Sequence, residues 1–420
     1  MTIAAHTLGC KLNYAETSDL LRRLASEGNT VVDWDRALAG DEKADLYIIN
    51  TCTVTAVAEK KCRNAIRQAH RSNPQAQIVV MGCFAQVAAE EIARIPGVTQ
   101  VLGNESKRLL SYSGSYSSEG SPDRTRTFFK IQDGCDYFCT YCAIPYARGR
   151  SRSASVEETL CMARRIADSG SKEIVLTGVN TGTFGQKASV EGVVGETFLD
   201  LLRGLDAIDG ILRYRISSIE PNLLTDDILR FVASSRAFLP HFHIPLQAGS
   251  DHILQLMHRR YDTALYRAKL ERIKELMPDA CIAADIMAGF NGESEEEFGK
   301  VLDYVDSLPI SYLHVFTYSD RPGTAALRLP EKVPVHVRHE HTARLLELSE
   351  KKHKAFIDSQ LGKTRPVLWE GSEVGGRTSN SQPVMLGWTD NYIRVSRPYD
   401  PSRVNTVEEV LLTNDNIVIS

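Results

Sequence analysis

The amino-acid sequence predicts an α/β protein that ends in a small all-β segment, and three observations carry this prediction. Apolar strand candidates alternate with amphipathic helix candidates over residues 1–110, and again from residue 128 to about 323. A Ser- and Gly-rich stretch separates these two regions. After Thr364 the helical pattern stops and short alternating stretches follow. A chain of 420 residues is long enough for two or three domains.

Composition and charge exclude some classes of protein. The hydrophobic content of 43% and the charged content of 24% are those of an ordinary soluble globular protein. No run of about 18 apolar residues is present, so no membrane span is expected. The start lacks the basic flank and long apolar core of a signal peptide, so we expect a cytoplasmic protein. The net charge of −4 neither supports nor excludes a nucleic-acid partner, since basic residues can gather in patches.

Residues 1–110 are expected to form a first domain with a flavodoxin-like parallel sheet. Residues 111–126 lack a core pattern and are interpreted as a linker. The strand candidates of the first domain are Thr2–Leu8, Asp45–Asn50, Gln77–Gly82 and Val98–Leu102. Its helix candidates are Glu16–Glu27, the basic segment Ala56–Ser72, and Ala85–Arg94.

Residues 127–363 are expected to form a second α/β domain with six parallel strands. A (β/α)6 partial barrel is favoured, and a doubly wound open sheet is the alternative; in both, active-site groups lie at the carboxyl ends of the strands. The strand candidates are Phe128–Gln132, Glu173–Thr177, Leu212–Ser217, Phe242–Pro245, Ile282–Met287 and Tyr312–Phe316. One or two long helices follow over residues 330–365, and residues 364–420 are expected to form a small all-β barrel.

Small and polar residues recur directly after the predicted strands of the second domain, where a bound ligand needs backbone access and hydrogen bonds. Polar residues at strand ends also cap helices, which is the alternative for each of them. The candidates for cofactor binding are Thr177, Asn180, Ser218, Glu220, Gln247 and Ser250.

Three cysteines, Cys135, Cys139 and Cys142, lie on one short segment with the spacing C-x3-C-x2-C. The segment offers three thiolates and no fourth ligand, whereas a structural zinc site and an ordinary 4Fe-4S site each require four. Three ligands leave one iron of a cluster open to a ligand that is not protein. A partial zinc site is the alternative.

Three further cysteines, Cys10, Cys52 and Cys83, each lie at or just past a predicted strand end of the first domain. In a parallel sheet such positions converge on one edge, so these thiols are candidates for a second cluster. Three buried structural thiols are an equally good interpretation from spacing alone. The remaining cysteines are expected not to be ligands, although one of them is only ten residues from Cys52; they are Cys62, Cys161 and Cys281.

These motifs occur in an order that resembles the radical-SAM methylthiotransferases along essentially the whole chain. The resemblance rests on the three amino-terminal cysteine motifs, the C-x3-C-x2-C segment and His243-Ile-Pro-Leu-Gln-Ala-Gly-Ser250. It implies a radical-SAM barrel in which Cys135, Cys139 and Cys142 hold a 4Fe-4S cluster that binds S-adenosylmethionine. It also implies an auxiliary 4Fe-4S cluster on the first set of cysteines and a carboxyl-terminal TRAM domain that helps to bind RNA. Asn291 departs from the Pro that the family usually has there.

Within the family, Gly9-Cys-Lys-Leu-Asn13 and Gly178-Val-Asn-Thr-Gly182 resemble the branch that modifies threonylcarbamoyladenosine at position 37 of tRNA. The alternatives are the isopentenyladenosine branch and the branch that modifies an aspartate of a ribosomal protein. The resemblance implies methylthiolation at C2 of the adenine, with one S-adenosylmethionine supplying the radical and another the methyl group. Lys11 is the candidate catalytic residue, because its ammonium can pair with the threonyl carboxylate; a solvated loop lysine is the alternative.

The expected partners are tRNA bearing threonylcarbamoyladenosine and an electron donor such as flavodoxin or ferredoxin, with the protein as a monomer. Basic residues after the C-x3-C-x2-C segment and on the basic helix are candidates for phosphate contacts. The last segment carries more acidic than basic side chains, so its role in RNA binding rests on the resemblance. The candidate phosphate contacts are Arg148, Arg150, Arg152, Lys60, Lys61, Arg63, Arg67 and Arg71.

Overall fold

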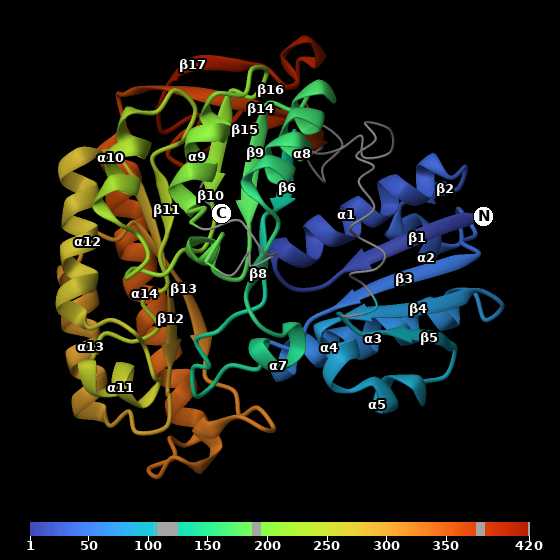
Figure 1. The fold of residues 1–420 in the computed structure, drawn as a ribbon, viewed down its shortest axis with the longest axis horizontal. Coiled ribbons are helices and arrows are strands. Elements are labelled where there is room, and N and C mark those ends of the chain that lie inside the picture. The colour runs from blue at the N-terminus through green and yellow to red at the C-terminus, as the bar shows by residue number, and fades with distance from the viewer. Residues whose placement is uncertain (105, 107–124, 187–194, 375–382, 419–420) are drawn as a thin grey trace.

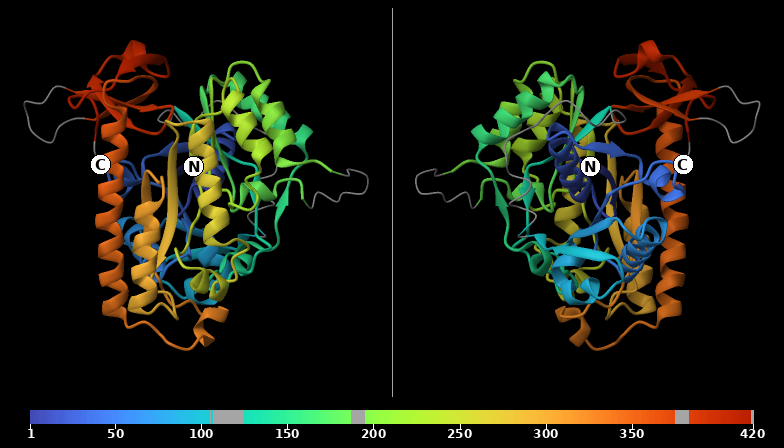
Figure 2. Two further views of the ribbon diagram at one scale, coloured as in Figure 1. Left: turned by 90° about the vertical axis from the view of Figure 1, so that its left-hand side faces the viewer. Right: turned by 90° about the vertical axis from the view of Figure 1, so that its right-hand side faces the viewer.

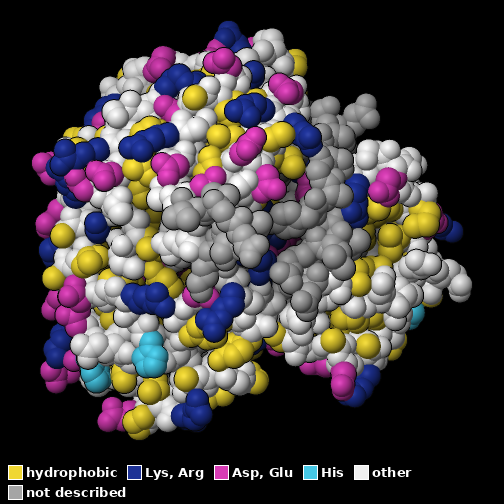
Figure 3. Space-filling view, viewed as in Figure 1, with side chains coloured by type: hydrophobic (Ala, Val, Ile, Leu, Met, Phe, Trp, Pro, Cys, Tyr) yellow, Lys and Arg dark blue, Asp and Glu magenta, His cyan; other side chains and the backbone are white. Residues whose placement is uncertain are grey.

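The structure is a computed structural model of the chain, and it describes residues 1–104, 106, 125–186, 195–374 and 383–418. The predicted linker lies outside these residues except for its last two positions, 125 and 126. Three regions follow one another along the chain (Figure 1): a parallel sheet, a larger strand-and-helix layer and a small antiparallel sheet. Acidic and basic side chains are interspersed on the face in Figure 3, in keeping with the small net charge.

The first region is a five-stranded sheet whose strands all run parallel, in the order β2-β1-β3-β4-β5. This order is that of flavodoxin-like folds, so the predicted fold is confirmed. The edge strand β2 was not predicted, because three residues are too few to show a pattern. The strands are β1 (Thr2–Thr7), β2 (Thr30–Val32), β3 (Leu46–Thr51), β4 (Gln77–Gly82) and β5 (Val98–Leu102).

The helices of the first region cover both faces of this sheet (Figure 1). The first begins directly after Cys10, five residues before its predicted start. The predicted helix Ala85–Arg94 is two shorter helices, and the six-residue α2 was not predicted. The helices are α1 (Lys11–Ser26), α2 (Trp34–Ala39), α3 (Ala56–Ser72), α4 (Cys83–Val87) and α5 (Ala89–Ala93).

The second region is a partial barrel of six parallel strands that follow one another in chain order. Two three-stranded sheets, β10-β9-β6 and β11-β12-β13, are joined by parallel bridges that include Ser218 with His243. The strands are neighbours in chain order throughout. This excludes the doubly wound alternative, because in that fold the strand order along the sheet reverses at one point. The strands are β6 (Arg126–Lys130), β9 (Glu173–Thr177), β10 (Arg213–Ile216), β11 (His241–His243), β12 (Cys281–Ala288) and β13 (Tyr312–Thr317).

Helices cover the outer face of the barrel, and the first region lies beside its open inner side (Figures 1 and 2). They are α8 (Val156–Asp168), α9 (Phe198–Asp206), α10 (Asp226–Ser234), α11 (Asp251–Leu256), α12 (Thr263–Leu276), α13 (Glu295–Ser307) and α14 (Val335–Gln360). The short elements near the inner side are β7 (Gln132–Asp133), α7 (Ile144–Arg148) and β8 (Arg152–Ser153).

The barrel strands have one apolar and one more polar face, because successive side chains of a strand point to opposite sides. On β12, Ile282, Ala284 and Ile286 are fully buried in the core formed with the outer helices. Asp285 and Met287 alternate with them and are only partly buried, on the inner face. The inner face of the barrel therefore offers polar groups toward the first region.

The third region is a four-stranded antiparallel sheet in the order β16-β15-β14-β17. It lies at the amino ends of the barrel strands, where Arg215 donates hydrogen bonds to the carbonyl oxygens of Thr389 (2.7 Å) and Asp390 (2.9 Å). The polar strand-end residues lie at the opposite end. The strands are β14 (Thr364–Val374), β15 (Val384–Thr389), β16 (Arg394–Pro398) and β17 (Val407–Leu411).

Over the described ranges, none of the helices is both long enough and apolar enough to span a bilayer.

Candidate active site

Three cysteines from three different loops meet at one edge of the first sheet. Cys10, Cys52 and Cys83 come just after β1, β3 and β4, which are neighbours in the sheet. Because the strands are parallel, their carboxyl ends reach the same edge. Cys10 caps the amino end of α1, and Cys83 is the first residue of α4. The convergence that the sequence predicts is present.

Side-chain hydrogen bonds tie the three cysteine loops to one another. Asn13 Nδ2 donates to the carbonyl oxygens of Leu8 (2.9 Å) and Thr51 (3.1 Å), which joins the first loop to the second. The Thr51 hydroxyl donates to the Met81 carbonyl oxygen at 2.7 Å, which joins the second loop to the third. The positions of the three thiols are thus fixed by buried polar contacts.

The surroundings of Cys52 show how close the loops lie. Gly9 has a φ of +109°, and a Cβ on it would lie 2.7 Å from the Cys52 Cβ, so only glycine allows this approach. Burial raises the pKa of the Cys52 thiol to about 12, and Cys83, Cys10 and Cys62 are near enough to raise it too. A metal centre must therefore displace the thiol proton when it binds.

The second set of cysteines lies on the loop between β7 and α7. Backbone N–H groups point at two of the sulfurs, from Tyr137 to Cys135 (3.5 Å) and from Ile144 to Cys142 (3.4 Å). Burial raises the pKa of Cys135 to about 11 and that of Cys142 to about 12. N–H donors to sulfur are among the features that tune iron–sulfur centres.

Arg259 supplies a charged donor to the same loop. Its Nη1 lies 3.2 Å from Cys139 Sγ and 3.4 Å from the Tyr141 hydroxyl, and its other terminal nitrogen pairs with Glu220. Arg259 could not be singled out from the sequence, because 120 positions separate it from Cys139 and no local pattern marks it. Burial raises the pKa of Glu220, and the adjacent guanidinium opposes that shift.

Both sets of cysteines fit a cluster better than a single ion. Within the described chain, the one group of three possible ligands whose donor atoms all lie within 4.8 Å is His243, Asp285 and His314. The thiols of neither cysteine set are that close, so neither set closes around one ion as in a structural zinc site. Three thiolates without a fourth protein ligand suit a 4Fe-4S cluster with an open iron.

A short path joins the two sets of cysteines. Asn104 Nδ2 lies 3.6 Å from Cys83 Sγ and donates at 2.7 Å to the Ala147 carbonyl oxygen. Ala147 belongs to α7, which begins two residues after Cys142 and lies between the first sheet and the barrel (Figure 1). Two centres bound here would lie near each other on either side of the domain boundary.

One predicted phosphate contact is wrong. The Arg148 side chain is only 1% exposed, and it bonds to Glu16 (3.0 Å) and Asp133 (2.9 Å) between the first region and the barrel. Arg152 also pairs with Asp133 and is 25% exposed. Arg150 is 69% exposed and remains a candidate for RNA binding.

Two of the residues predicted to bind the cofactor have protein partners for their hydroxyl groups. The Thr177 hydroxyl donates to the Val175 carbonyl oxygen at 3.0 Å, within its own strand. The Ser250 hydroxyl donates to the Glu297 carboxylate on α13. These two residues lie at the strand ends as expected, and their role in cofactor binding stays a prediction.

The other four residues predicted to bind the cofactor lie around the carboxyl ends of the barrel strands. Asn180 Oδ1 accepts the Glu220 N–H at 3.5 Å, and Glu220 leads through Arg259 to the second cysteine loop. Ser218 pairs with the end of β11 through its backbone. Gln247 has a φ of +65° and pairs with β12 through its backbone. The structure thus brings Asn180 and Glu220 together beside the cysteines.

The loop at Asn291, which departs from the family pattern, is held by its own contact. The Asn291 side chain is fully buried and donates to the Ala326 carbonyl oxygen at 2.9 Å. The Ala326 N–H in turn donates to the Thr140 carbonyl oxygen at 2.8 Å, inside the second cysteine loop. Asparagine therefore supplies a tether at a position where proline has no donor.

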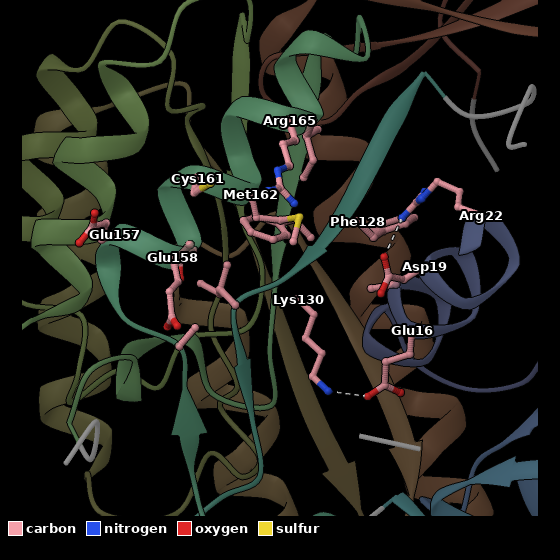
Figure 4. A pocket seen from close by; sticks show the side chains of 16 residues that line it. Glu16, Asp19, Arg22, Phe128, Lys130, Glu157, Glu158, Cys161, Met162 and Arg165 are labelled. Atoms are coloured by element: carbon pink, nitrogen blue, oxygen red, sulfur yellow. Dashed lines mark hydrogen bonds and ion pairs between the residues drawn. The ribbon is translucent and has the colours of Figure 1, made fainter. Parts of the chain in front are cut away.

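A separate cavity of about 510 Å³ is lined mainly by residues of α1, β6 and α8 (Figure 4). Glu16 and Lys130 meet on one side of it, with Nζ and Oε1 2.8 Å apart. Phe128 and Met162 contribute apolar surface. None of the six cysteines lines this cavity, so we do not assign it to the reaction.

Comparisons with known proteins agree with this geometry. The model of the uncharacterized protein family UPF0004 matches residues 2–103, and that of the radical SAM superfamily matches residues 129–305. The chain is 37% identical to the threonylcarbamoyladenosine tRNA methylthiotransferase MtaB of Bacillus subtilis (strain 168), over 94% of this chain and 90% of that protein. It is 36% identical to the protein of that name in Aquifex aeolicus (strain VF5), over 88% and 92%.

More distant relatives were found as well. The chain is 31% identical to the tRNA-2-methylthio-N(6)-dimethylallyladenosine synthase of Desulfitobacterium hafniense (strain Y51), over 97% of this chain and 94% of that protein. Among solved structures, it is similar to the radical S-adenosylmethionine methyltransferase TsrM from Kitasatospora setae, with a TM-score of 0.56 and 15% identity. That likeness covers 83% of this chain and 90% of the other and concerns the fold alone.

Proposed function

The chain belongs to the radical-SAM methylthiotransferases, and from this premise we propose that it methylthiolates C2 of N6-threonylcarbamoyladenosine at position 37 of tRNA. The observation that carries the proposal is a three-cysteine set in each α/β region, with Asn104 linking Cys83 of one set to α7, which follows the other. The substrate is assigned from relatives that carry the corresponding name at 31–37% identity over most of the chain. The relative named for dimethylallyladenosine is less similar than the Bacillus protein, so we do not favour that substrate.

Two 4Fe-4S clusters and S-adenosylmethionine are the cofactors of this activity. Cys135, Cys139 and Cys142 hold one cluster, and the other is held by the set at the edge of the first sheet. When bound, these groups supply the radical and sulfur-transfer chemistry, and the protein orients and shields them. The protein's own part is to keep three thiolates per centre, so that one iron of each stays open to a ligand.

We assign the binding of S-adenosylmethionine to the strand-end residues beside the second cysteine loop. Glu220 is a buried carboxylate held by Arg259, and such a pair suits the amino and carboxylate groups of a methionine moiety. Asn180 lies against Glu220, with 3.5 Å between its Oδ1 and the Glu220 backbone nitrogen. Gln247 and Ser218 complete the rim at the ends of β11 and β10.

A surface beside the second cysteine loop suits an RNA loop. Phe138 and Tyr146 are 39% and 62% exposed, and their rings lie edge to face with centroids 6.2 Å apart. The guanidinium of Arg150 lies 4.7 Å from the Phe138 ring centroid, and that of Arg260 lies 4.1 Å from the Tyr137 ring centroid. Exposed aromatic rings with arginines are what unpaired bases stack on. Tyr137 is only 8% exposed, so we call Phe138, Tyr146, Arg150 and Arg260 the aromatic–arginine surface and propose that it contacts the anticodon loop.

The proposal also covers the assembly state, the compartment, the electron donor and the third region of the protein. The protein acts as a monomer in the cytoplasm, where its tRNA substrate is found, and takes electrons from a flavodoxin- or ferredoxin-like donor. Residues 364–420 act as the TRAM domain of the family. The first domain ends at residue 110, the radical-SAM domain spans residues 127–363, and the TRAM domain begins at residue 364, as expected from the sequence.

The test is an anaerobic assay of the reconstituted protein. S-adenosylmethionine, dithionite and tRNA carrying threonylcarbamoyladenosine are supplied, and the nucleosides are analysed by mass spectrometry. We expect the 2-methylthio derivative of threonylcarbamoyladenosine. Product only on tRNA carrying isopentenyladenosine would keep the chemistry and refute the substrate. No product on either RNA, with both clusters intact, would refute the assignment to tRNA.

A further inference from the structure

A second polar cluster lies on the inner face of the barrel, apart from both cysteine sets. It consists of His243 on β11, Asp285 on β12 and His314 on β13, whose donor atoms all lie within 4.8 Å of one another. Strand register places them together, because Asp285 is the direct neighbour of His314 and lies two residues beyond the neighbour of His243. We call these three residues the His–Asp cluster.

The cluster has a defined internal arrangement. His243 Nε2 and Asp285 Oδ1 are 2.7 Å apart, and the rings of His243 and His314 have centroids 5.1 Å apart. Burial and the adjacent His243 hold the pKa of His314 near 4, so this ring is neutral at physiological pH. Burial disfavours the Asp285 carboxylate, but His243, His314 and Lys11 outweigh it and keep its pKa below the usual value.

Lys11 belongs to the first region, and its charge acts electrostatically on this cluster. It is the first residue of α1, directly after Cys10, and its charge acts on both Asp285 and His314. Its ammonium makes no hydrogen bond or ion pair with any part of the chain that the structure describes. The position of Lys11 therefore connects the first set of cysteines with the barrel interior.

His314 is the exposed member of the cluster. Its ring nitrogens have no hydrogen-bond partner among the described residues, while its ring contacts those of His243 and Tyr312. Phe316, two residues further on the same face of β13, is 41% exposed. An imidazole and an apolar ring thus lie on the same face of β13, and the charge of Lys11 acts on that imidazole.

This set of groups suits a small amphipathic anion. An ammonium recognises a carboxylate, a neutral imidazole can donate to or accept from a hydroxyl, and a phenyl ring packs against a methyl group. The Lys11 charge repels a divalent cation and attracts an anion, which favours the anion here.

We propose that Lys11 and His314 form the subsite for the threonyl end of the N6 substituent. In this subsite Lys11 pairs with the carboxylate, His314 bonds to the hydroxyl, and Asp285 with His243 fixes the His314 ring. This inference rests on the proposed function and deepens it, because it assigns the recognition of the substituent to named residues. Lys11 and His314 contact the substrate, and Asp285 and His243 are positioning residues.

The test measures binding without turnover. Reconstituted holoenzyme, without reductant, is titrated with anticodon stem-loops of one sequence that differ only at position 37. Three stem-loops carry adenosine, N6-threonylcarbamoyladenosine or the N6-glycylcarbamoyl analogue, which keeps the carboxylate and lacks the hydroxyl. For the wild type we expect the threonylcarbamoyl RNA to bind about tenfold to hundredfold more tightly than the adenosine RNA, as one or two charge-assisted bonds allow.

The variants separate the two contacts. Lys11→Met should remove most of the preference for both carboxylate-bearing RNAs and leave the adenosine RNA unaffected. His314→Gln should reduce the discrimination between the threonyl and glycyl RNAs by about two- to tenfold, the contribution of one hydrogen bond. Lys43→Met removes an exposed lysine of the same region, so it is the matched control and should bind all three RNAs like the wild type. Unchanged iron content shows that each variant is folded.

Three results would overturn the subsite. Equal weakening of all three RNAs in Lys11→Met would make Lys11 a general RNA contact. Unchanged discrimination in His314→Gln would remove His314 from recognition. Stoichiometric zinc or manganese in the wild type that His314→Gln loses would make the cluster a metal site. A wild type that shows no preference for the threonylcarbamoyl RNA would instead refute the proposed substrate, which keeps the two failures apart.

Discussion

At the scale of single residues, the cysteines and the arginines were unequally predictable. The second set of cysteines has a diagnostic spacing on one loop, and the first set follows three strands whose parallel order can be inferred. Arg148 and Arg259 act through partners more than 100 positions away in the chain. Contacts of that kind leave no local pattern, so Arg148 was expected on the surface and Arg259 was not singled out.

Arg259 leads to a prediction about cofactor binding. Arg259→Met removes the donor to Cys139 and leaves the Glu220 carboxylate buried without its partner. We expect the affinity for S-adenosylmethionine to fall about tenfold or more, because charge-assisted pairs contribute roughly 1.5–3 kcal/mol. Arg259→Lys keeps the charge but not the planar guanidinium. Its affinity for S-adenosylmethionine should therefore lie between those of the wild type and Arg259→Met. Equilibrium dialysis of reconstituted protein measures the affinity.

The neighbouring arginine provides the control for this experiment. Arg260 is exposed, donates to the Asp136 carbonyl oxygen and stacks on Tyr137, and it bonds to neither Cys139 nor Glu220. Arg260→Met should therefore bind S-adenosylmethionine like the wild type. An equal loss in the two variants would show that only the local positive charge matters.

At the scale of elements, long periodic segments were predicted and short ones were not. Helix α3 and strand β4 have their predicted bounds, since each has an uninterrupted apolar pattern. The short elements β2 and α2 were missed, because three and six residues do not show a period. The early start of α1 has another cause: the turn that contains Cys10 begins the helix, so the cysteine lies at its amino end.

The contact between α13 and α14 leads to a prediction about pH. His341 is fully buried, stacks on Phe298 at 3.7 Å between centroids, and lies 2.8 Å from Glu293 and 3.0 Å from Glu295. Burial lowers its pKa, but the bonds to the two carboxylates outweigh burial and raise it above the usual value. A raised pKa in the folded state stabilises the protein below pH 6.5, and this contribution is lost as the pH rises through the raised value.

His341→Gln is expected to remove that contribution. The variant should be less stable than the wild type by roughly 1–3 kcal/mol at pH 6, and the difference should shrink as the pH rises through the raised pKa of His341. Thermal unfolding at a series of pH values measures it. A difference that stays constant from pH 6 to pH 9 would show that His341 acts through packing alone.

At the scale of the whole molecule, buried arginines hold the three regions together. Arg148 joins the first region to the barrel through Glu16 and Asp133. Arg213 joins the barrel to the third region by a hydrogen bond to the Trp388 carbonyl oxygen, and Arg215 does so through its bonds to residues 389 and 390. The Glu173 carboxylate holds both side chains, with distances of 2.8 Å to Arg215 Nε and 3.0 Å to Arg213 Nε. The class and order of the regions could be predicted from periodicity. Their mutual arrangement could not, because it depends on single long-range contacts.

The Arg215 contact predicts how the third region is held. Arg215→Met removes two bonds to backbone carbonyls of residues 389–390 and one bond to Glu173. Breaking a buried pair should destabilise the protein by about 3–5 kcal/mol and increase cleavage within residues 364–418 by protease. Arg203→Met is the control, since Arg203 is 60% exposed and 3.7 Å from Asp200, a surface pair worth about 0–1 kcal/mol. Equal protease sensitivity of the two variants would contradict this role.

The proposed activity requires two iron–sulfur centres, one on each three-cysteine set, and iron content tests this most directly. Protein reconstituted anaerobically should contain about eight irons per chain, as two four-iron clusters require. Replacing Cys10, Cys52 and Cys83 with alanine should leave about four, as should replacing Cys135, Cys139 and Cys142. About four irons in the wild type, with no loss when the first set is replaced, would contradict the second centre and the methylthiotransferase activity that depends on it.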